Sequence, residues 1–385
     1  MTGWILKALE TLAAVGALSA NAYYALCLWS AWMFARSLKA VPPSAWTPPV
    51  SILKPLKGVD PDQYESFKSH CFQEYPTYEI IFGVSEASDP ALDLVRRLQS
   101  EFPEKEIRAM VCDQNLGANT KVSNLAQMAA QARYDLLIVN DSDIRVEPDY
   151  VRRAVAPLSD SKVGLVTCLY RGIASPTLGS RLEALGISTD FIPGVLVARC
   201  LEGIHFGLGS TLAFRHSDLA AIGGFQEFVD YLADDYEIGK RIAERGLEVR
   251  LSDQVVETFL PAYSLREFLH HQLRWSRSIR DSRRWGYVGL VFTFGLPWAL
   301  LALLLSPVSW WVWLLLGVTA GIRLAVALSV GAFRLRDRQV ARYWWLIPVR
   351  DFAALLVWMA SFAGHTVAWR GDTFRLKDGK LARIV

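Results

Sequence analysis

The feature that most constrains this chain is a run of 24 residues near its start, 11–34, that carries no charged side chain. About 20 consecutive apolar residues are enough for a helix to cross the hydrocarbon core of a bilayer. The stretch 17–22, ALSANA, is similar to a signal-peptidase site, but the apolar run continues beyond it to Phe34. We therefore predict a retained transmembrane anchor over residues 1–38 rather than a cleaved signal.

Apolar stretches also fill the other end of the chain, residues 287–369. The stretches 288–305 and 308–330 are separated only by Ser306 and Pro307, which predicts a tight hairpin of membrane helices. A third stretch, about 343–369, is interrupted by a proline, an arginine and an aspartate at 348, 350 and 351. It either spans the membrane or lies partly in the interface, and a basic tail, 370–385, follows it.

Positive charges flank these membrane segments. Arg36 and Lys39 follow the N-terminal run, and four arginines stand in the linker 333–343. Cytoplasmic loops are enriched in Lys and Arg, so this pattern predicts an integral membrane protein whose central domain is cytoplasmic. In a bacterium the membrane would be the inner one. A third C-terminal span would place the basic tail outside, against the same rule.

Composition excludes several classes of protein. Hydrophobic residues make up 52% of the 385, and the mean hydropathy is +0.21, which is high for a soluble protein. The net charge is only +3, so it gives no reason to expect a nucleic acid partner. The five cysteines are scattered without a CxxC pair, which argues against a disulfide framework or a zinc site.

The central part of the chain, 48–262, has an α/β pattern. Short β-rich runs alternate with helical stretches: the runs are 50–56, 78–85, 107–112 and 134–140, and the helices 63–72, 90–101 and 120–133. Two more strands are predicted at 247–253 and 254–260. Alternation with almost continuous apolar strands is typical of a mostly parallel sheet covered on both faces. Ligands of such sheets bind beyond the carboxyl ends of the strands.

Two carboxylates stand at one of these strand ends. Asp141 and Asp143 follow the aliphatic run 136–139 in the sequence LLIVNDSDI. Alternate residues of a strand point to the same side, so the two side chains can converge on one point. A cation such as Mg²⁺ takes one or two carboxylates together with substrate phosphates. The alternative is that Asp143 caps a turn and Asp141 is solvated at the edge of the sheet.

Two later stretches carry further candidate residues. Asp234 and Asp235 stand where a helix is predicted to start, in LADDYEIGKRIAERG. Either their negative charges only stabilise the helix by interacting with its dipole, or one of them is a general base. Residues 263–286 predict a basic amphipathic helix suited to a membrane interface, and it contains His271, Arg274 and Trp275.

These pieces together resemble the ceramide glucosyltransferase family, whose bacterial relatives include hopanoid glycosyltransferases. The resemblance rests on the N-terminal anchor and on SILKPLKGVDP, NTKVSNL, VNDSDIRVEPD, KVGLV, LADDYEIGKRIAERG, LRWSRSIR and WRGDTFRL, and covers nearly the whole chain. It implies a GT-A fold, a nucleotide-sugar-binding α/β domain with a mostly parallel sheet. One N-terminal and about three C-terminal membrane segments would accompany this domain.

The family signature is three acidic positions followed by a (Gln/Arg)xxArgTrp box. The resemblance implies these matches for the acidic positions: Glu86 or Asp89, then Asp141 with Asp143 completing a DxD, then Asp235 with Asp234 as the alternative register. In the box Arg274 and Trp275 match, whereas His271 stands where Gln or Arg is expected. A histidine can donate to a phosphate but is charged only part of the time near neutral pH.

The resemblance also implies a role for each residue. Asp141 and Asp143 would bind Mn²⁺ or Mg²⁺, and Asp235 or Asp234 would be the base. The implied donor-binding set is Glu86, Asp89, Lys54, Lys121, Asp141, His271, Arg274 and Trp275. For Lys54 and Lys121 the alternative is a plain surface lysine.

The function implied is that of a membrane-bound, inverting hexosyltransferase that moves glucose from a UDP-sugar to ceramide. The first alternative is transfer of N-acetylglucosamine to a hopanoid or another lipid. A processive polysaccharide synthase is a second alternative, but it needs a translocation channel of several helices. A catalytically silent scaffold is a third, against which the retained acidic residues argue.

Overall fold

The computed structural model describes residues 2–38, 46–60, 62–369 and 372–383, so Lys39 and both ends of the basic tail lie outside it. The chain divides into two compact units. The helical unit comprises Met1–Ser37, Pro176–Glu202 and Ala262–Asp378. The sheet unit comprises Leu38–Ser175, Gly203–Pro261 and Gly379–Val385. The predicted α/β region, 48–262, is therefore interrupted by a segment that belongs to the helical unit.

The first half of the sheet unit alternates strands and helices as predicted. The elements are β1 (Val50–Pro55), α2 (Gln63–Cys71), β2 (Tyr78–Val84), α3 (Ala91–Glu101), β3 (Glu106–Val111), α4 (Thr120–Ala130) and β4 (Leu136–Val139). All residues of β1 and β4 are buried, which explains why β4 is wholly aliphatic, whereas β1 combines Val50, Ile52 and Leu53 with a serine, a lysine and a proline. Strands β1, β2, β3 and β4 pair in parallel.

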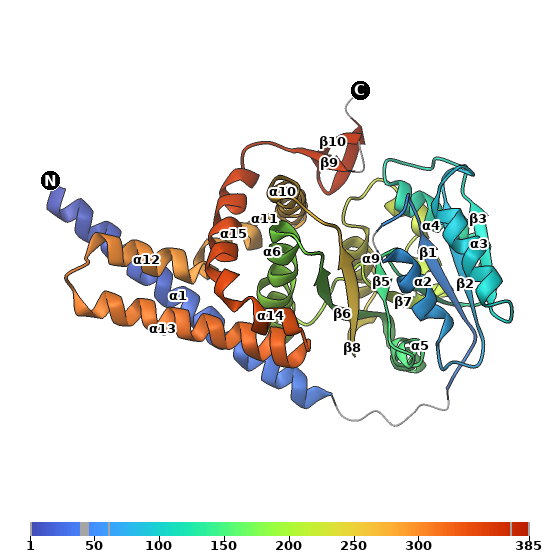
Figure 1. The fold of residues 1–385 in the computed structure, drawn as a ribbon, viewed down its shortest axis with the longest axis horizontal. Coiled ribbons are helices and arrows are strands. Elements are labelled where there is room, and N and C mark those ends of the chain that lie inside the picture. Colours follow the sequence, from blue (N-terminus) through green and yellow to red (C-terminus); the bar gives the residue numbers. More distant parts are fainter. Residues whose placement is uncertain (1, 39–45, 61, 370–371, 384–385) are drawn as a thin grey trace. The chain divides into compact units, whose positions relative to one another are not determined.

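The second half completes an eight-stranded sheet. Its elements are β5 (Ile144–Arg145), α5 (Tyr150–Val155), β6 (Val163–Ala174), β7 (Leu212–Arg215), α8 (His216–Ala221), α9 (Asp234–Glu244) and β8 (Glu248–Leu260), with short 3₁₀ turns at Ala156–Ser159 and Phe225–Phe228. The strand order is β3-β2-β1-β4-β7-β6-β8-β5. Strand β7 is antiparallel to β4 and β6, and β5 to β8, while β6 and β8 are parallel. The prediction of a mostly parallel sheet is confirmed (Figure 1).

The two strands predicted at 247–253 and 254–260 are one continuous strand, β8. It pairs with β6 along its whole length. The register shifts between the pair Thr167–Leu251 and the pair Leu169–Val255. Three residues of β8 thus stand opposite one residue of β6, which is a bulge. The polar residues Ser252 and Asp253 lie in this bulge, so they resemble a turn in the sequence without ending the strand.

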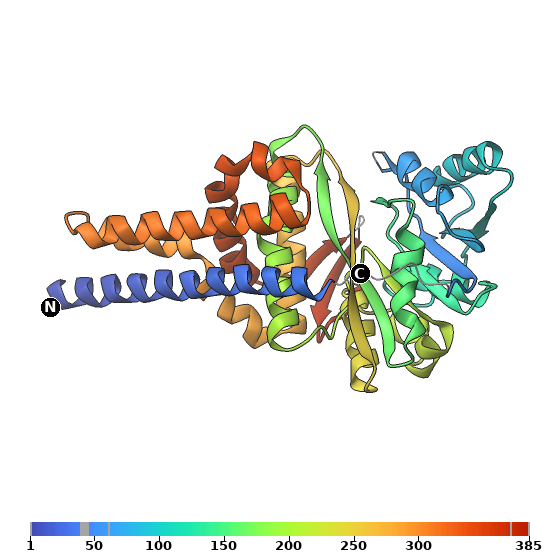
Figure 2. The ribbon, with the colours of Figure 1, turned by 90° about the horizontal axis from the view of Figure 1, so that it is seen from below.

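The helical unit is built around three long helical stretches. Its elements are α1 (Thr2–Ser37), α6 (Leu178–Gly186), the π-turn η2 (Ile187–Phe191), α7 (Ile192–Leu201), α10 (Leu265–Ser282), α11 (Arg284–Gly289), η4 (Leu290–Thr293), α12 (Gly295–Leu305), α13 (Trp310–Val326), η5 (Ala327–Arg334), α14 (Arg338–Arg342), η6 (Trp344–Leu346), α15 (Ile347–Ser361), β9 (Thr366–Trp369) and β10 (Asp372–Lys377). Helices α1, α12 and α13 pack together through small and aliphatic side chains such as Ala13, Ala17 and Ala299 (Figures 1 and 2).

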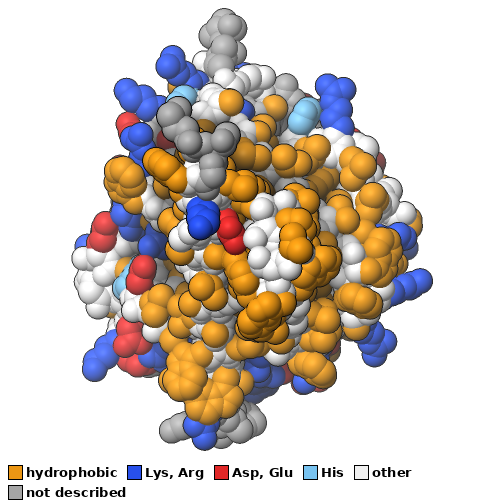
Figure 3. Space-filling view, turned by 90° about the vertical axis from the view of Figure 1, so that its left-hand side faces the viewer, with side chains coloured by type: hydrophobic (Ala, Val, Ile, Leu, Met, Phe, Trp, Pro, Cys, Tyr) orange, Lys and Arg blue, Asp and Glu red, His pale blue; other side chains and the backbone are white. Residues whose placement is uncertain are grey.

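Three helical stretches in the described chain are long and apolar enough to cross a membrane: Trp4–Ser37, Leu178–Leu201 and Trp310–Arg334. A fourth arises if Arg284–Thr293 and Gly295–Leu305, bent by 50°, count as one. The predicted anchor and hairpin are thus confirmed as apolar helices. Hydrophobic side chains gather in the middle of the face shown in Figure 3, where α1 and α13 begin and α12 ends.

The structure adds one candidate span and bears on one alternative that the sequence left open. Leu178–Leu201 is a candidate span that the sequence did not indicate, because its charged residues and Pro193 interrupt the apolar pattern. Of the two alternatives for 343–369, a candidate span is not found there among the described residues, because its helix α15 has only 15 residues and a strand follows.

The end of the chain returns to the sheet unit. The strand β11 (Lys380–Arg383) follows a turn, and Leu232 N–H donates to the Gly379 carbonyl at 3.1 Å. Leu381 N–H donates to the Asp230 carbonyl at 2.7 Å. Residues 379–383 of the basic tail therefore pack on the sheet unit.

Candidate active site

The carboxyl end of β4 is fixed by one buried amide. Asn140 is fully buried, and its Nδ2 donates to the Tyr150 hydroxyl at 2.8 Å and the Ser210 carbonyl at 2.7 Å. The ring of His70 contacts Asn140 Oδ1 through Nε2 at 3.3 Å, and burial holds the pKa of that ring well below its usual range. Because a neutral histidine and an amide cost little to bury together, the strand end is a rigid base for the residues that follow.

Asp141 and Asp143 lie in a turn after β4 rather than on the strand itself. Asp141 Oδ1 pairs with Lys121 Nζ at 2.8 Å, while Asp143 Oδ2 accepts a hydrogen bond from the Thr258 hydroxyl of β8. Burial, and next the charge of Asp141, raise the pKa of Asp143 to about 6. Because β4 ends at Val139, the positions of the two carboxylates are set by the turn and by their separate partners rather than by strand alternation.

Lys54, at the carboxyl end of β1, is not a surface lysine. Its side chain is fully buried, and Nζ donates to the Asp141 carbonyl at 3.0 Å. Burial lowers the pKa of this amine to about 7, against the charges of Asp143 and Asp141, which raise it. Lys54 thus supports the turn from below.

Lys121 lies at the centre of the acidic cluster. The helix α4 that carries it is capped by Asn119, whose Oδ1 accepts from Val122 N–H at 3.2 Å and whose Nδ2 donates to the Tyr231 carbonyl at 2.7 Å. Burial acts to lower the pKa of Lys121, but the carboxylates of Asp141, Asp234 and Asp235 outweigh it and raise that pKa. The amine is therefore a permanent cation among the acids.

Asp234 and Asp235 open the helix α9, as predicted, and differ in their surroundings. Asp234 is 5% exposed, and its Oδ2 lies 3.5 Å from Lys121 Nζ, an ion-pair distance rather than a hydrogen bond. Asp235 is only partly buried, and its Oδ1 accepts from Tyr236 N–H at 2.8 Å. Burial, and next the charge of Asp234, raise the pKa of Asp235 to about 6, while Lys121 opposes them.

The glycine-bearing loop 207–210 brings the clusters together. A Cβ on Gly209 would lie 3.2 Å from Asp235 Oδ2 and 3.3 Å from Asp141 Oδ2. The two carboxylates therefore face the same point of the chain, although they come from different elements. Gly207 N–H donates to the Asp235 carbonyl at 3.1 Å, which ties the loop to the start of α9.

Gly209→Ala is expected to slow catalysis about 10- to 100-fold with little loss of stability, because the new methyl group must displace two carboxylates by a few tenths of an ångström. The turnover number and the melting temperature of the purified protein would be measured. Gly317→Ala is the control, because a Cβ there meets nothing within 4 Å. Wild-type turnover in Gly209→Ala would contradict the close approach.

Glu86 and Asp89 are near the carboxyl end of β2, where they were expected. Glu86 is exposed. Asp89 accepts from Gly58 N–H at 3.1 and 3.0 Å and from Ala91 N–H at 2.9 Å. Asp89 thus holds the loop after β1 and the start of α3, whereas Glu86 is the carboxylate of the two that is open to a ligand.

His271, Arg274 and Trp275 lie on α10 and belong to the helical unit, not to the sheet unit that carries the acids. His271 Nδ1 lies 3.2 Å from Oε1 of the buried Glu183, and its ring stacks on Tyr263. The capping box of Ser264 and Glu267, absent from the sequence prediction, begins this helix.

The donor set at Asp141 and Asp143 suits a divalent cation that is completed by a ligand. No group of three or more His, Cys, Asp or Glu side chains that could hold a metal occurs among the described residues. Mg²⁺ and similar hard ions need only one or two carboxylates when substrate phosphates supply further oxygens. The residues therefore fit a metal shared with a phosphorylated substrate rather than a site built from protein alone.

Four residues of this site were not singled out in the sequence. Asn140 and Thr258 hold the turn, Asn119 caps α4, and Gly209 separates the two carboxylates. Asn119 could have been found, since an Asn directly before a helix is a common cap. The others depend on contacts between residues far apart in the sequence.

Comparisons with known proteins identify the family of the chain. A sequence model described as glycosyl transferase family 21 matches residues 12–382. Ceramide glucosyltransferase 1 of Caenorhabditis elegans is 24% identical over 350 residues, 88% of this chain and 74% of that protein. Ceramide glucosyltransferase 3 of the same organism is 24% identical over 348 residues, 86% and 73% of the two chains.

A solved structure shares the fold. The mannosyltransferase PcManGT from Pyrobaculum calidifontis, in complex with GDP-Man and Mn²⁺, superposes with a TM-score of 0.54 at 18% identity, covering 92% of this chain and 99% of that one. The prediction of a GT-A fold is confirmed, with candidate membrane helices attached. The chain therefore belongs to glycosyl transferase family 21 and is a hexosyltransferase.

Proposed function

We propose that this glycosyltransferase is an inverting enzyme of the cytoplasmic membrane face that transfers glucose from UDP-glucose to the primary hydroxyl of ceramide. The observation that carries the proposal is the cluster of Lys121, Asp141, Asp234 and Asp235. In it Asp235, whose pKa is raised, and Asp141 both face the loop at Gly209. The relatives named ceramide glucosyltransferase support the sugar and the acceptor.

Asp235 is the proposed base. It is more accessible than Asp234, whose carboxylate is buried and occupied by Lys121. With a pKa of about 6 it is ionised at neutral pH and still basic enough to accept the proton of an attacking hydroxyl. Attack by that hydroxyl on the anomeric carbon, opposite the nucleotide, inverts the configuration in one step.

Asp141 and Asp143 are the residues that would hold a divalent cation, Mn²⁺ or Mg²⁺, together with the donor's pyrophosphate. Such an ion neutralises the charge that develops on the leaving group. Lys121 is the proposed second positive charge near the phosphates, and Lys54 keeps the turn in place beneath them. Glu86 is proposed to contact the nucleoside end of the donor, and His271, Arg274 and Trp275 its phosphates.

The pH dependence follows from the base. Because burial raises the pKa of Asp235 to about 6, its carboxylate becomes protonated as the pH falls through 6 and can no longer accept a proton. We expect kcat/KM to be constant near neutral pH and to fall about tenfold per pH unit below about 6. Steady-state rates between pH 4.5 and 8 measure this, and a profile still flat at pH 5 would contradict the role.

The substrates are tested by a transfer assay on the purified chain in nanodiscs. UDP-glucose, UDP-galactose and UDP-N-acetylglucosamine would each be combined with ceramide, diacylglycerol and a polyol hopanoid, with Mn²⁺, Mg²⁺ or EDTA. Metal-dependent glucosylation of ceramide is expected. Transfer of N-acetylglucosamine to the hopanoid alone would keep the mechanism and replace both substrates, and no product with no donor hydrolysis would contradict the proposal.

A further inference from the structure

The C-terminal strand, by which we mean residues 379–383, pairs with a segment of the sheet unit that lies far earlier in the chain. Leu232 N–H donates to the Gly379 carbonyl at 3.1 Å. Leu381 N–H donates to the Asp230 carbonyl at 2.7 Å. Backbone hydrogen bonds of this kind are the means by which an extended peptide adds a strand to a partner. The end of the chain therefore holds the residues around Asp230 in place.

The contacted segment, 229–232, is also bound to a second element. Asn119 N–H donates to the Val229 carbonyl at 2.6 Å, and Asn119 Nδ2 donates to the Tyr231 carbonyl at 2.7 Å. Asn119 is the residue that caps α4, the helix that carries Lys121. The 229–232 segment is thus hydrogen-bonded both to the C-terminal strand and to the start of α4.

The contact with the start of α4 is close. A Cβ on Gly117 would lie 2.5 Å from Val229 Cγ2 and 2.8 Å from Asp230 Oδ1. Ala118 N–H donates to Asp230 Oδ1 at 2.9 Å. Because Asp230 accepts from Ala118 through its side chain and from Leu381 through its carbonyl, it joins the two elements.

The 229–232 segment leads directly into α9, the helix that begins with Asp234 and Asp235. Ala233 stands at the N-cap position, where its methyl group cannot accept a hydrogen bond from the first turn. The first turn is held from one side by Gly207 N–H, which donates to the Asp235 carbonyl at 3.1 Å. Its position otherwise depends on the segment that precedes it, and hence on the C-terminal strand.

A side-chain contact accompanies the backbone hydrogen bonds. Lys380 Nζ lies 5.1 Å from the centre of the Tyr231 ring, and the guanidinium of Arg241, on α9, lies 5.7 Å from that centre. Gly379 has a φ of +78°, and a Cβ there would lie 3.4 Å from Tyr231 Cδ1, so glycine suits this approach. Cation–π contacts of exposed side chains are weak, so we assign the main effect to the two backbone hydrogen bonds.

We propose that the C-terminal strand positions Asp235 for the transfer step by holding the 229–232 segment in place. This inference rests on the proposed function, because it takes Asp235 as the base. A base must lie within hydrogen-bond distance of the attacking hydroxyl, and a displacement of about 1 Å can slow such a step about 100-fold. Leu381 is thus a positioning residue, which acts through its backbone N–H on the segment that leads to the base.

Leu381→Pro tests the inference in the full-length chain in phosphatidylcholine nanodiscs, because proline lacks the N–H that donates to Asp230. We expect kcat for glucosylation of ceramide to fall about 10- to 100-fold, with the KM for UDP-glucose and the melting temperature close to those of the wild type. The α-hydroxy analogue of leucine at position 381 replaces the amide by an ester and removes the same donor without the proline ring, so it should also lower kcat selectively. A wild-type kcat in both variants would overturn the inference.

Two further variants separate positioning from a general loss of structure. Lys380→Gln removes the charge beside Tyr231 and keeps both backbone hydrogen bonds, so kcat should stay within about threefold of the wild type. A loss as large as that of Leu381→Pro would overturn the role of the N–H. In the Asp235→Asn background, where the base is absent, adding Leu381→Pro should lower the residual rate less than about twofold. A further fall of about 10-fold or more would show that the strand does not act through Asp235.

Hydrogen exchange separates this inference from the proposed function, because it needs no turnover. Mass spectrometry of the peptide that covers 229–236 should show exchange about tenfold faster in Leu381→Pro than in the wild type, with the peptides of β1, β2 and β4 unchanged. Equal exchange of that peptide in the two proteins would overturn the inference. If exchange is faster but the wild type glycosylates no lipid, the proposed function fails, whereas the hold of the C-terminal strand on the start of α9 is supported.

Discussion

Asp235→Asn is expected to lower the rate of glycosyl transfer by about 10²–10⁴-fold, the usual contribution of a positioned general base. The amide has nearly the same shape as the carboxylate, so the hydrogen bond from Tyr236 N–H to Oδ1 can remain. Binding of the UDP-sugar should therefore change little. Turnover and donor affinity are measured separately, the second by titration calorimetry.

The control for this prediction lies on the same helix. Glu237 is two residues from Asp235 on α9, about 200° around the helix axis, and its carboxylate lies 3.8 Å from Lys240 Nζ. Glu237→Gln removes the same charge without touching the acidic cluster, so its turnover should stay near that of the wild type. If both variants retain full activity, Asp235 is not the base. Loss of activity in Asp234→Asn alone would assign the role to Asp234.

Arg323→Met is expected to destabilise the helical unit by about 3–5 kcal/mol. Arg323 and Asp351 are 3% and 7% exposed, and breaking a buried ion pair leaves the remaining charge without a partner. The carbonyl of Thr189 loses a donor at the same time. The free energy of unfolding would be measured by titrating the protein in lipid micelles with a denaturing detergent.

Two further variants make that measurement specific. In Arg323→Met/Asp351→Leu both charges are absent, so the destabilisation should be much smaller than in the single variant. Arg283→Met removes an exposed pair with Glu202 and should cost about 0–1 kcal/mol. A single variant as stable as Arg283→Met would show that the pair does not hold α13 to α15.

The sheet could be predicted because its strands carry their own signal. Strands β1 and β4 are buried on both faces, so β4 is a continuous aliphatic run and β1 carries Val50, Ile52 and Leu53. The break expected inside β8 arose from Ser252 and Asp253, polar residues that a bulge accommodates. Local composition cannot distinguish a bulge from a turn, because the difference lies in the partner strand.

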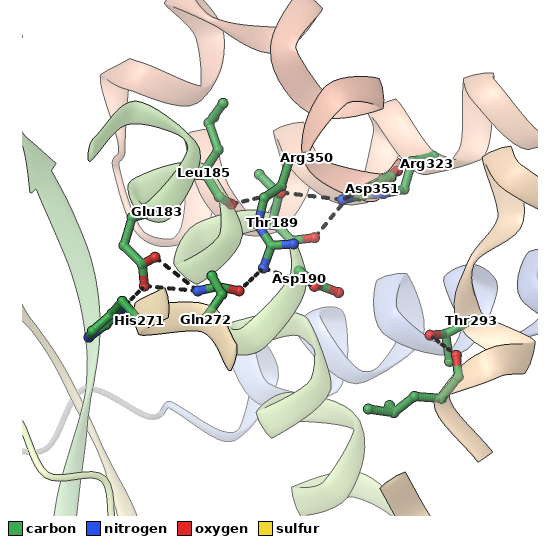
Figure 4. Close-up of polar contacts among 11 residues, drawn as sticks. Glu183, Leu185, Thr189, Asp190, His271, Gln272, Thr293, Arg323, Arg350 and Asp351 are labelled. Carbon is green, nitrogen blue, oxygen red and sulfur yellow. Dashed lines mark hydrogen bonds and ion pairs between the residues drawn. The ribbon is translucent and has the colours of Figure 1, made fainter. Parts of the chain in front are cut away.

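The membrane segments were harder to predict where they contain charged and polar side chains that pair with residues of other helices. Leu178–Leu201 contains Glu183, Thr189 and Asp190, which make contacts to α10, α13 and α15. In α15, Arg350 donates to Gln272 of α10 and Asp351 accepts from Arg323 of α13 (Figure 4). Each charged residue therefore indicates the end of an apolar segment, unless its partner, which is far away in the sequence, is known.

Only part of the candidate site could be predicted from the sequence, for the same reason. Asp141, Asp143, Asp234, Asp235 and Lys121 could be singled out by residue type and position, and all of them lie at the carboxyl ends of strands or at the start of helices. The pairing of Lys121 with Asp141 and Asp234, and the burial of Lys54, follow from packing between elements. Strand alternation was the wrong geometry for Asp141 and Asp143 because β4 ends at Val139.

The most direct test of the account is the structure of the product made by the wild-type enzyme from UDP-glucose and ceramide in Mn²⁺-containing nanodiscs. The glucose of the donor is α-linked, so one-step attack by a hydroxyl deprotonated at Asp235 predicts β-linked glucosylceramide. The anomeric coupling constant in a proton NMR spectrum distinguishes the two configurations. A β-linked product would support the account, whereas an α-linked product, or none on ceramide, would contradict it.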